Sequence, residues 1–151
     1  MGVGAPLVVA LVALSTVGTL AWLAVRALAQ PPGTPDRIVA ELRLSQLASL
    51  VLAFTAAGYL GLAAARADAP GAALDAALTL VFLGVAVVAS LRDPHEALTW
   101  LALGFLVHVG VDLLHGPELL LSGVAPRWYV VGCALHNGIA GALCYLPLLR
   151  R

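Results

Sequence analysis

The sequence has no lysine, a single methionine and few charged residues of either sign. Only 11% of its 151 residues are charged, and eight arginines balance eight acidic residues, so the formal net charge is zero. Such a chain offers no basic surface for nucleic acid. Its two cysteines, Cys133 and Cys144, lie about 16 Å apart along one expected helix, which excludes a disulfide between them within that helix.

Several catalytic motifs are also absent. The chain contains no H-E-x-x-H zinc-protease helix, no G-x-S-x-G nucleophile turn and no phosphate-binding Walker loop. The corresponding hydrolases and nucleotide-binding enzymes therefore have no motif support, and the sequence assigns no catalytic residue.

Hydrophobic residues, by contrast, are abundant. They make up 62% of the sequence, and the mean hydropathy is +1.00. Soluble domains are about 45–50% apolar and about 25% charged. The composition therefore predicts an integral membrane protein whose first partner is the lipid bilayer.

Five apolar stretches are close to or above the ~20 residues that a helix needs to cross a bilayer. Thr34 followed by Pro35 indicates a helix start, and Asp93 with Glu96 has the pattern of a capping box. We expect an all-α, five-helix bundle that forms one membrane-embedded domain over residues 1–151. Its expected helices are 6–26, 35–65, 71–91, 94–115 and 127–149.

The arginine positions predict the orientation of the bundle. If the N-terminus is outside, the loops place six arginines inside (Arg26, Arg37, Arg43, Arg92, Arg150 and Arg151) and two outside (Arg66 and Arg127). By the positive-inside rule this excess predicts an outer N-terminus and an inner C-terminus. We expect a multi-pass protein of a prokaryotic cytoplasmic membrane. Glu41 is expected to pair with Arg37 or Arg43 at the level of the lipid headgroups.

Three ionisable residues interrupt the fourth expected helix: His108, Asp112 and His115. Their i, i+4, i+7 spacing places them within a ~60° arc on one face. Each such group costs roughly 2.5–3.5 kcal/mol to insert, so it usually faces a protein interior or a cavity. The stripe is the strongest site hypothesis in the chain. The alternative is a polar network that holds helices together, although such hydrogen bonds average only ~0.6 kcal/mol in membranes.

The fifth expected helix supplies a set of polar residues that would face this stripe. Helices joined by a short connector are usually antiparallel neighbours, and His136 lies about as deep in the fifth helix as His108 does in the fourth. We therefore expect the two imidazoles to meet. The predicted pocket is completed by Tyr59, Asp75, Tyr129, Cys133 and Asn137. For Asp75, the alternative is an interfacial acid near a helix start.

Three chemistries suit these residue types. Imidazole and carboxylate are ligands for zinc, iron, manganese or copper. The candidate metal ligands are His108, Asp112 and His136, with His115 in support. A second option is haem b, with His108 and His136 as its axial ligands. A third option needs no cofactor: a His–Asp–His row is a candidate proton or ion relay, because histidine titrates near neutral pH.

The leading expectation is a small membrane protein that binds a metal ion or haem in the outer half of the bundle, between the fourth and fifth helices. One alternative is a non-catalytic accessory subunit of a larger membrane complex. Small size and Gly/Ala-rich helix faces are compatible with it. The other alternative is a proton-coupled transporter or channel protomer that self-associates.

Overall fold

The computed structural model describes residues 4–115 and 124–150, which fold as five long helices and one short 3-10 turn. The elements are α1 (Gly4–Ala29), α2 (Pro35–Ala65), α3 (Ala72–Ser90), α4 (Pro94–His115), α5 (Arg127–Tyr145) and the turn η1 (Leu146–Leu149). No strand occurs within the described ranges. The five helices, with η1 extending the last, are long and apolar enough to cross a membrane, which confirms the predicted all-α fold.

Local capping explains where two of these helices begin. Thr34 Oγ1 accepts a hydrogen bond from the Arg37 backbone N–H at 3.3 Å, and Asp93 Oδ1 accepts one from the Glu96 N–H at 3.1 Å. Each bond satisfies one of the N–H groups that a helix start leaves without a partner. Of the two hydrogen bonds of the predicted capping box, only this one to Asp93 is formed, because the Glu96 carboxylate instead pairs with Arg92 at 3.2 Å.

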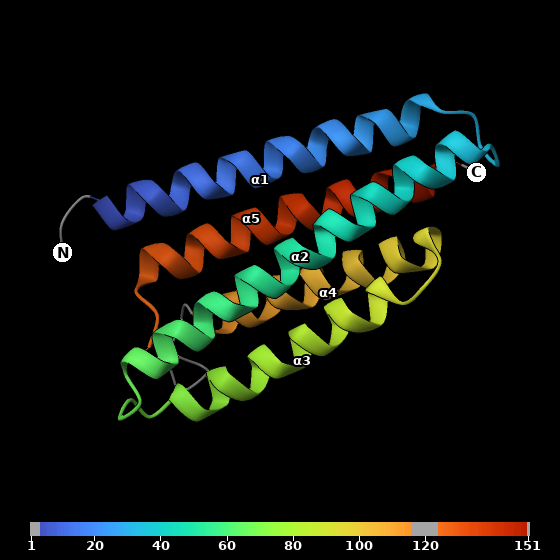
Figure 1. The fold of residues 1–151 in the computed structure, drawn as a ribbon. Helices are drawn as coiled ribbons and strands as arrows, with labels where there is room; N and C mark the ends of the chain where they lie inside the picture. The colour runs from blue at the N-terminus through green and yellow to red at the C-terminus, as the bar shows by residue number, and fades with distance from the viewer. Residues whose placement is uncertain (1–3, 116–123, 151) are drawn as a thin grey trace.

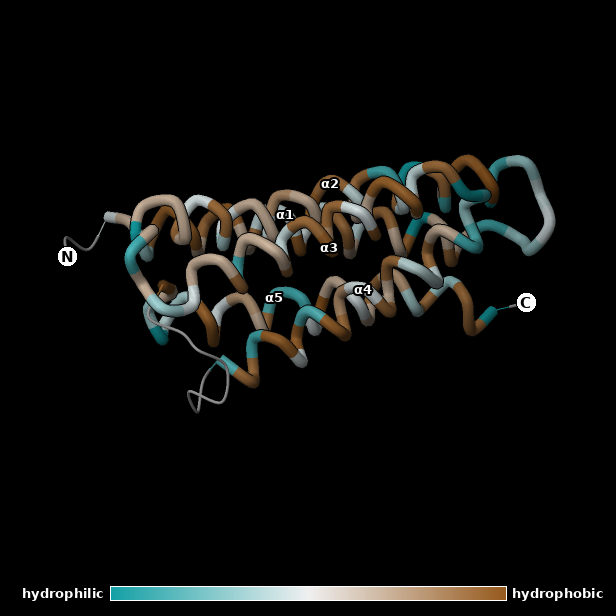
Figure 2. Tube along the Cα trace, turned by 90° about the horizontal axis from the view of Figure 1, so that it is seen from below, coloured by the Kyte–Doolittle hydropathy of each residue, from teal (hydrophilic) through white to brown (hydrophobic). Residues whose placement is uncertain are grey.

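Neighbouring helices along the chain run in opposite directions (Figure 1). The start of α1, the α2–α3 connection and the end of α4 lie at one end of the bundle, which we call the N-terminal end. The C-terminus lies at the opposite, C-terminal end. Hydrophobic residues dominate the helix bodies, and much of the hydrophilic colour lies toward the two ends (Figure 2). Which end faces outward stays a prediction, and Arg151 lies outside the described residues.

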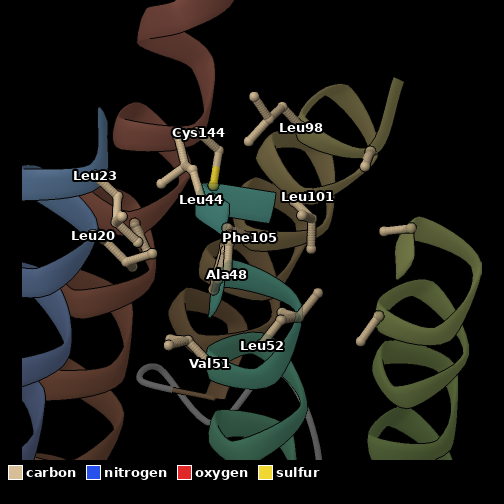
Figure 3. Packing of buried hydrophobic residues seen from close by; sticks show 14 of the residues in the cluster. Leu20, Leu23, Leu44, Ala48, Val51, Leu52, Leu98, Leu101, Phe105 and Cys144 are labelled. Carbon is tan, nitrogen blue, oxygen red and sulfur yellow. The ribbon is translucent and has the colours of Figure 1, made fainter. Parts of the chain in front are cut away.

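The main apolar core fills the C-terminal half of the bundle. It is formed mainly by leucine, alanine and phenylalanine side chains from all five helices, with Val51 and Cys144 among them (Figure 3). Its fully buried members include Leu20, Leu44, Leu52, Leu98, Leu101 and Phe105. A second, small apolar cluster of Ala63, Ala72 and Val124 lies at the N-terminal end. The stretch between these two clusters is where buried polar side chains collect.

At the C-terminal end, Arg37 of α2 connects three segments. Its Nη1 donates to the Ala27 carbonyl of α1 at 2.7 Å, and its Nη2 donates to the Pro147 carbonyl of η1 at 2.8 Å. Its Nε donates to the carboxylate of Glu41, one helical turn away. The Arg37 and Glu41 side chains are only 5% and 9% exposed. The expected ion pair of Glu41 is therefore formed with Arg37, inside the protein.

α5 approaches α4 closely at Gly141. A Cβ atom there would lie 3.2 Å from Phe105 Cβ and 3.4 Å from the Ala102 carbonyl. We expect Gly141→Leu to overpack this contact and to lower the free energy of unfolding by about 1–3 kcal/mol, measured by SDS titration in mixed micelles. Gly138→Leu is the matched control, because Gly138 is exposed on the same helix. Equal losses in the two variants would contradict this account of the contact.

Candidate functional site

The ionisable stripe of α4 faces the interior of the bundle. His108, Asp112 and His115 are 1%, 0% and 4% exposed. They span about 10 Å along the helix axis, from its last turn toward its middle. Tyr59 of α2, Asp75 of α3 and Asn137 of α5 are also buried and meet this stripe. The site therefore joins four of the five helices.

The first half of the site is built around Asp112. Its Oδ1 accepts a hydrogen bond from the Tyr59 hydroxyl at 2.7 Å. Its Oδ2 lies 3.3 Å from His108 Nδ1 and accepts a hydrogen bond from Asn137 Nδ2 at 3.2 Å. Asn137 Nδ2 is also 3.0 Å from His108 Nδ1. Three polar atoms thus form a compact triangle, and the tyrosine holds the carboxyl from the other side.

This triangle allows two arrangements of hydrogen. In one, a neutral His108 ring accepts a hydrogen bond from Asn137 through Nδ1, which leaves Nδ1 facing a carboxyl oxygen of Asp112. In the other, a proton lies between Nδ1 and that oxygen and makes their contact a hydrogen bond. The two arrangements differ in the position or number of protons.

The second half of the site is a His115–Asp75 pair. His115 Nδ1 lies 2.8 Å from the Val111 carbonyl, which only accepts, so this nitrogen carries a hydrogen. Nε2 lies 2.8 Å from Asp75 Oδ1. A bond of that length needs one further proton, held by the ring or by the carboxyl. The pair is neutral overall in either case, which suits a site in which both side chains are 1% exposed.

Aromatic rings line both halves. The Tyr59 ring centroid lies 5.8 Å from that of His108 and 5.7 Å from that of His115, so one tyrosine contacts both imidazoles. Phe82 of α3 packs on His108 at 4.3 Å. Tyr129 of α5 meets Tyr59 edge to face at 5.4 Å. These rings surround the polar groups with apolar surface, which strengthens the electrostatic interactions among them.

A small cavity lies between the two halves. The residues that line it are Ala56, Tyr59, Asp75, Leu78, Thr79, Phe82, His108, Val111 and His115. It has room for about one water molecule. His108 of the first pair and both members of the second pair, Asp75 and His115, therefore line the same space.

Asn137, and not the adjacent His136, occupies the position facing α4 that was expected for the histidine. His136 Nε2 lies 2.9 Å from Thr16 Oγ1 of α1, whereas Asn137 contacts His108 and Asp112. Adjacent residues of a helix point about 100° apart, so α5 presents its asparagine to α4 and its histidine to α1. The expected meeting of the two imidazoles has no support in this arrangement.

The remaining predicted pocket residues take different positions. Asp75 is buried, which favours its interpretation as a pocket residue over that of an interfacial acid. Tyr129 contacts the site through Tyr59, and Cys133 is buried one turn further along α5. Tyr129 also packs against α2 where Gly58 has no side chain, because a Cβ there would lie 2.0 Å from the tyrosine hydroxyl.

The geometry gives no support to the expected metal or haem. Within residues 4–115 and 124–150, no three His, Cys, Asp or Glu side chains are grouped so that they could hold a metal ion. Structural and catalytic metal sites need at least three converging protein ligands in most cases. The imidazoles of this site instead hydrogen-bond with carboxyl, amide and carbonyl groups.

Thr79 and Phe82 are site residues that the sequence pattern does not single out by itself. Thr79 Oγ1 lies within hydrogen-bonding distance of the Asp75 carbonyl (2.9 Å) and of the Ala56 carbonyl of α2 (3.1 Å). They follow Asp75 by four and seven positions, the spacing that places side chains on one helix face. With Asp75 placed inside, this spacing identifies both of them.

Comparison with known protein families, with curated proteins and with solved structures gives no match for this chain.

Proposed function

We propose that this chain is a proton-handling membrane protein, the protomer of a proton-coupled transporter. The observation that carries the proposal is the presence of two buried imidazole–carboxyl pairs, His108–Asp112 and His115–Asp75, on either side of one cavity. Each pair has a place for a proton between an imidazole nitrogen and a carboxyl oxygen. Such pairs exchange protons readily, which is why intramembrane relays use them.

Helix adhesion alone is a weaker explanation of the same groups. Four ionisable side chains inside a bilayer each carry an insertion cost of roughly 2.5–3.5 kcal/mol on translocon scales. A hydrogen bond between transmembrane helices returns only ~0.6 kcal/mol on average. A bundle that needed only adhesion would be more stable with small apolar residues at these positions, as it has elsewhere along α2 and α5.

The position of the site favours a carrier over an open channel. Asp75 lies one turn from the start of α3 at the N-terminal end, which the arginine distribution assigns to the outside. Toward the opposite end lies the apolar core around Leu44, Leu98 and Phe105. Protons would therefore enter from outside, and their passage to the inside would require a rearrangement of helices.

The test is proton flux in liposomes. Purified protein is reconstituted with an enclosed pH-sensitive dye, and a potassium diffusion potential drives protons inward. We expect flux above that of protein-free liposomes, and we expect Asp112→Asn to reduce it by about tenfold or more, because the amide no longer exchanges a proton with His108. Asp68→Asn is the matched control, because Asp68 is exposed in the α2–α3 connection.

Three results would contradict the proposal. The first is wild-type flux equal to that of protein-free liposomes, and the second is equal loss of flux in Asp112→Asn and Asp68→Asn. The third is a stoichiometric metal or a haem absorption band in the purified protein, removed by His108→Ala, which would restore the cofactor hypothesis. Membership of a larger complex stays a prediction, and fixed partner chains in the same purification would support it.

A further inference from the structure

Asp75 has a carboxyl oxygen that the described side chains leave without a partner. Its Oδ1 is bonded to His115, but no hydrogen-bond partner of its buried Oδ2 is found among the described residues. The side chain is 1% exposed. A buried carboxyl oxygen without a hydrogen bond is costly, and native structures usually satisfy such atoms with an ordered water.

The cavity supplies the space for such a water. Asp75 lines it from α3 and His108 lines it from α4. His108 Nδ1 is already bonded to Asp112 and Asn137, so Nε2 is the ring nitrogen left to face the cavity. Most of the cavity lining is apolar, and its size is just enough for one water. The polar partners available to that water are the Asp75 Oδ2 atom and the His108 ring.

We propose that one buried water molecule bridges the Asp75 carboxyl and the His108 ring and joins the two imidazole–carboxyl pairs into a single proton path. The step starts from an ionised Asp112, a His108 ring protonated on Nδ1, and an Asp75 that carries an additional proton on Oδ2 while the proton of its bond to His115 stays in place. The water accepts the Oδ2 proton and gives one of its own protons to His108 Nε2, and His108 releases its Nδ1 proton to Asp112. One proton has moved from Asp75 to Asp112, the His115–Asp75 pair is neutral again, the His108 ring ends protonated on Nε2, and the water is unchanged.

This inference rests on the proposed function for its role in transport, but the water site itself does not. The titratable groups that face the cavity are Tyr59 of α2, Asp75 of α3, and His108 and His115 of α4. Thr79 and four apolar residues form the rest of the wall. Without the water, the proton path between the two imidazole–carboxyl pairs is incomplete.

A cavity-filling substitution tests the bridge. Ala56→Val adds two methyl carbons at the cavity wall, and Ala53→Val makes the same change one turn earlier on α2 outside the cavity. Water is detected as a cross-peak between water protons and the Thr79 methyl group in methyl-labelled protein. We expect the wild type and Ala53→Val to show the cross-peak, and Ala56→Val to lose it. We expect Ala56→Val alone to lose proton flux, by about tenfold or more.

The outcomes separate this inference from the proposed function. A missing cross-peak in the wild type overturns the water site, and so does full flux in an Ala56→Val protein that has lost the water. A cross-peak that behaves as expected in a protein without any proton flux supports the water site and overturns the transport function. If Ala56→Val does not fold, Leu78→Phe fills the same cavity from α3, and the same criteria apply to it.

Discussion

Replacing Arg37 by methionine is expected to lower the free energy of unfolding by about 3–5 kcal/mol, which is the typical cost of removing one partner of a buried ion pair. The substitution leaves Glu41 buried without its cation, and it removes the donors to the Ala27 and Pro147 carbonyls. Methionine retains much of the apolar volume of the side chain, so the lost hydrogen bonds account for the effect. SDS titration followed by circular dichroism measures it.

Two further variants test whether the loss of stability is specific to the guanidinium of Arg37. Arg37→Lys keeps the charge but lacks the planar guanidinium that reaches four acceptors, so an intermediate loss of stability is expected. Arg43→Met is the matched control, because Arg43 is exposed on the same helix, and its effect should stay within about 0.5 kcal/mol. If Arg37→Met and Arg43→Met cost the same, Arg37 does not connect the three segments as described.

Each single substitution in the His115–Asp75 pair is expected to lower the free energy of unfolding, while the double substitution should recover most of that loss. Asp75→Leu leaves His115 Nε2 without the Asp75 acceptor, and His115→Phe leaves a second buried carboxyl oxygen of Asp75 without its bond. We expect each to cost about 3 kcal/mol, and the double variant to return to within about 1 kcal/mol of the wild type, because a buried pair can be replaced by apolar residues of similar size.

The coupling free energy from this double-mutant cycle is the quantity to compare. The exposed Arg92–Glu96 pair is the control, since its side chains are 48% and 43% exposed and its coupling should lie near 0–1 kcal/mol. Strictly additive losses at Asp75 and His115 would show that the two side chains do not form one unit. That result would also remove one of the two proton sites on which the proposed function depends.

The five helices and the inward stripe of α4 could be predicted because they depend on local information. Apolar length sets the spans, Thr34 and Asp93 cap two helix starts, and the cost of inserting His108 directs it away from lipid. These signals are all contained in a few neighbouring residues. The same is true of the Arg37–Glu41 pair, whose members are one turn apart.

The partners of the stripe depend on helix rotation, which the sequence does not determine. Counting residues places His136 and Asn137 at nearly the same depth, but the two point about 100° apart, and packing against α1 and α4 decides which one enters the site. Likewise, nothing near Arg37 indicates the Pro147 carbonyl, which lies 110 positions away. Contacts of this kind follow from tertiary packing alone.

The contact between Arg37 and Pro147 also constrains biogenesis. The first two helices enter the membrane before η1 is synthesised, and in that interval the guanidinium lacks one of its acceptors. A hairpin of α1 and α2 alone therefore retains a buried guanidinium with an incomplete set of acceptors. Formation of η1 supplies the missing carbonyl, so the hairpin reaches its full stability only after η1 has packed against it.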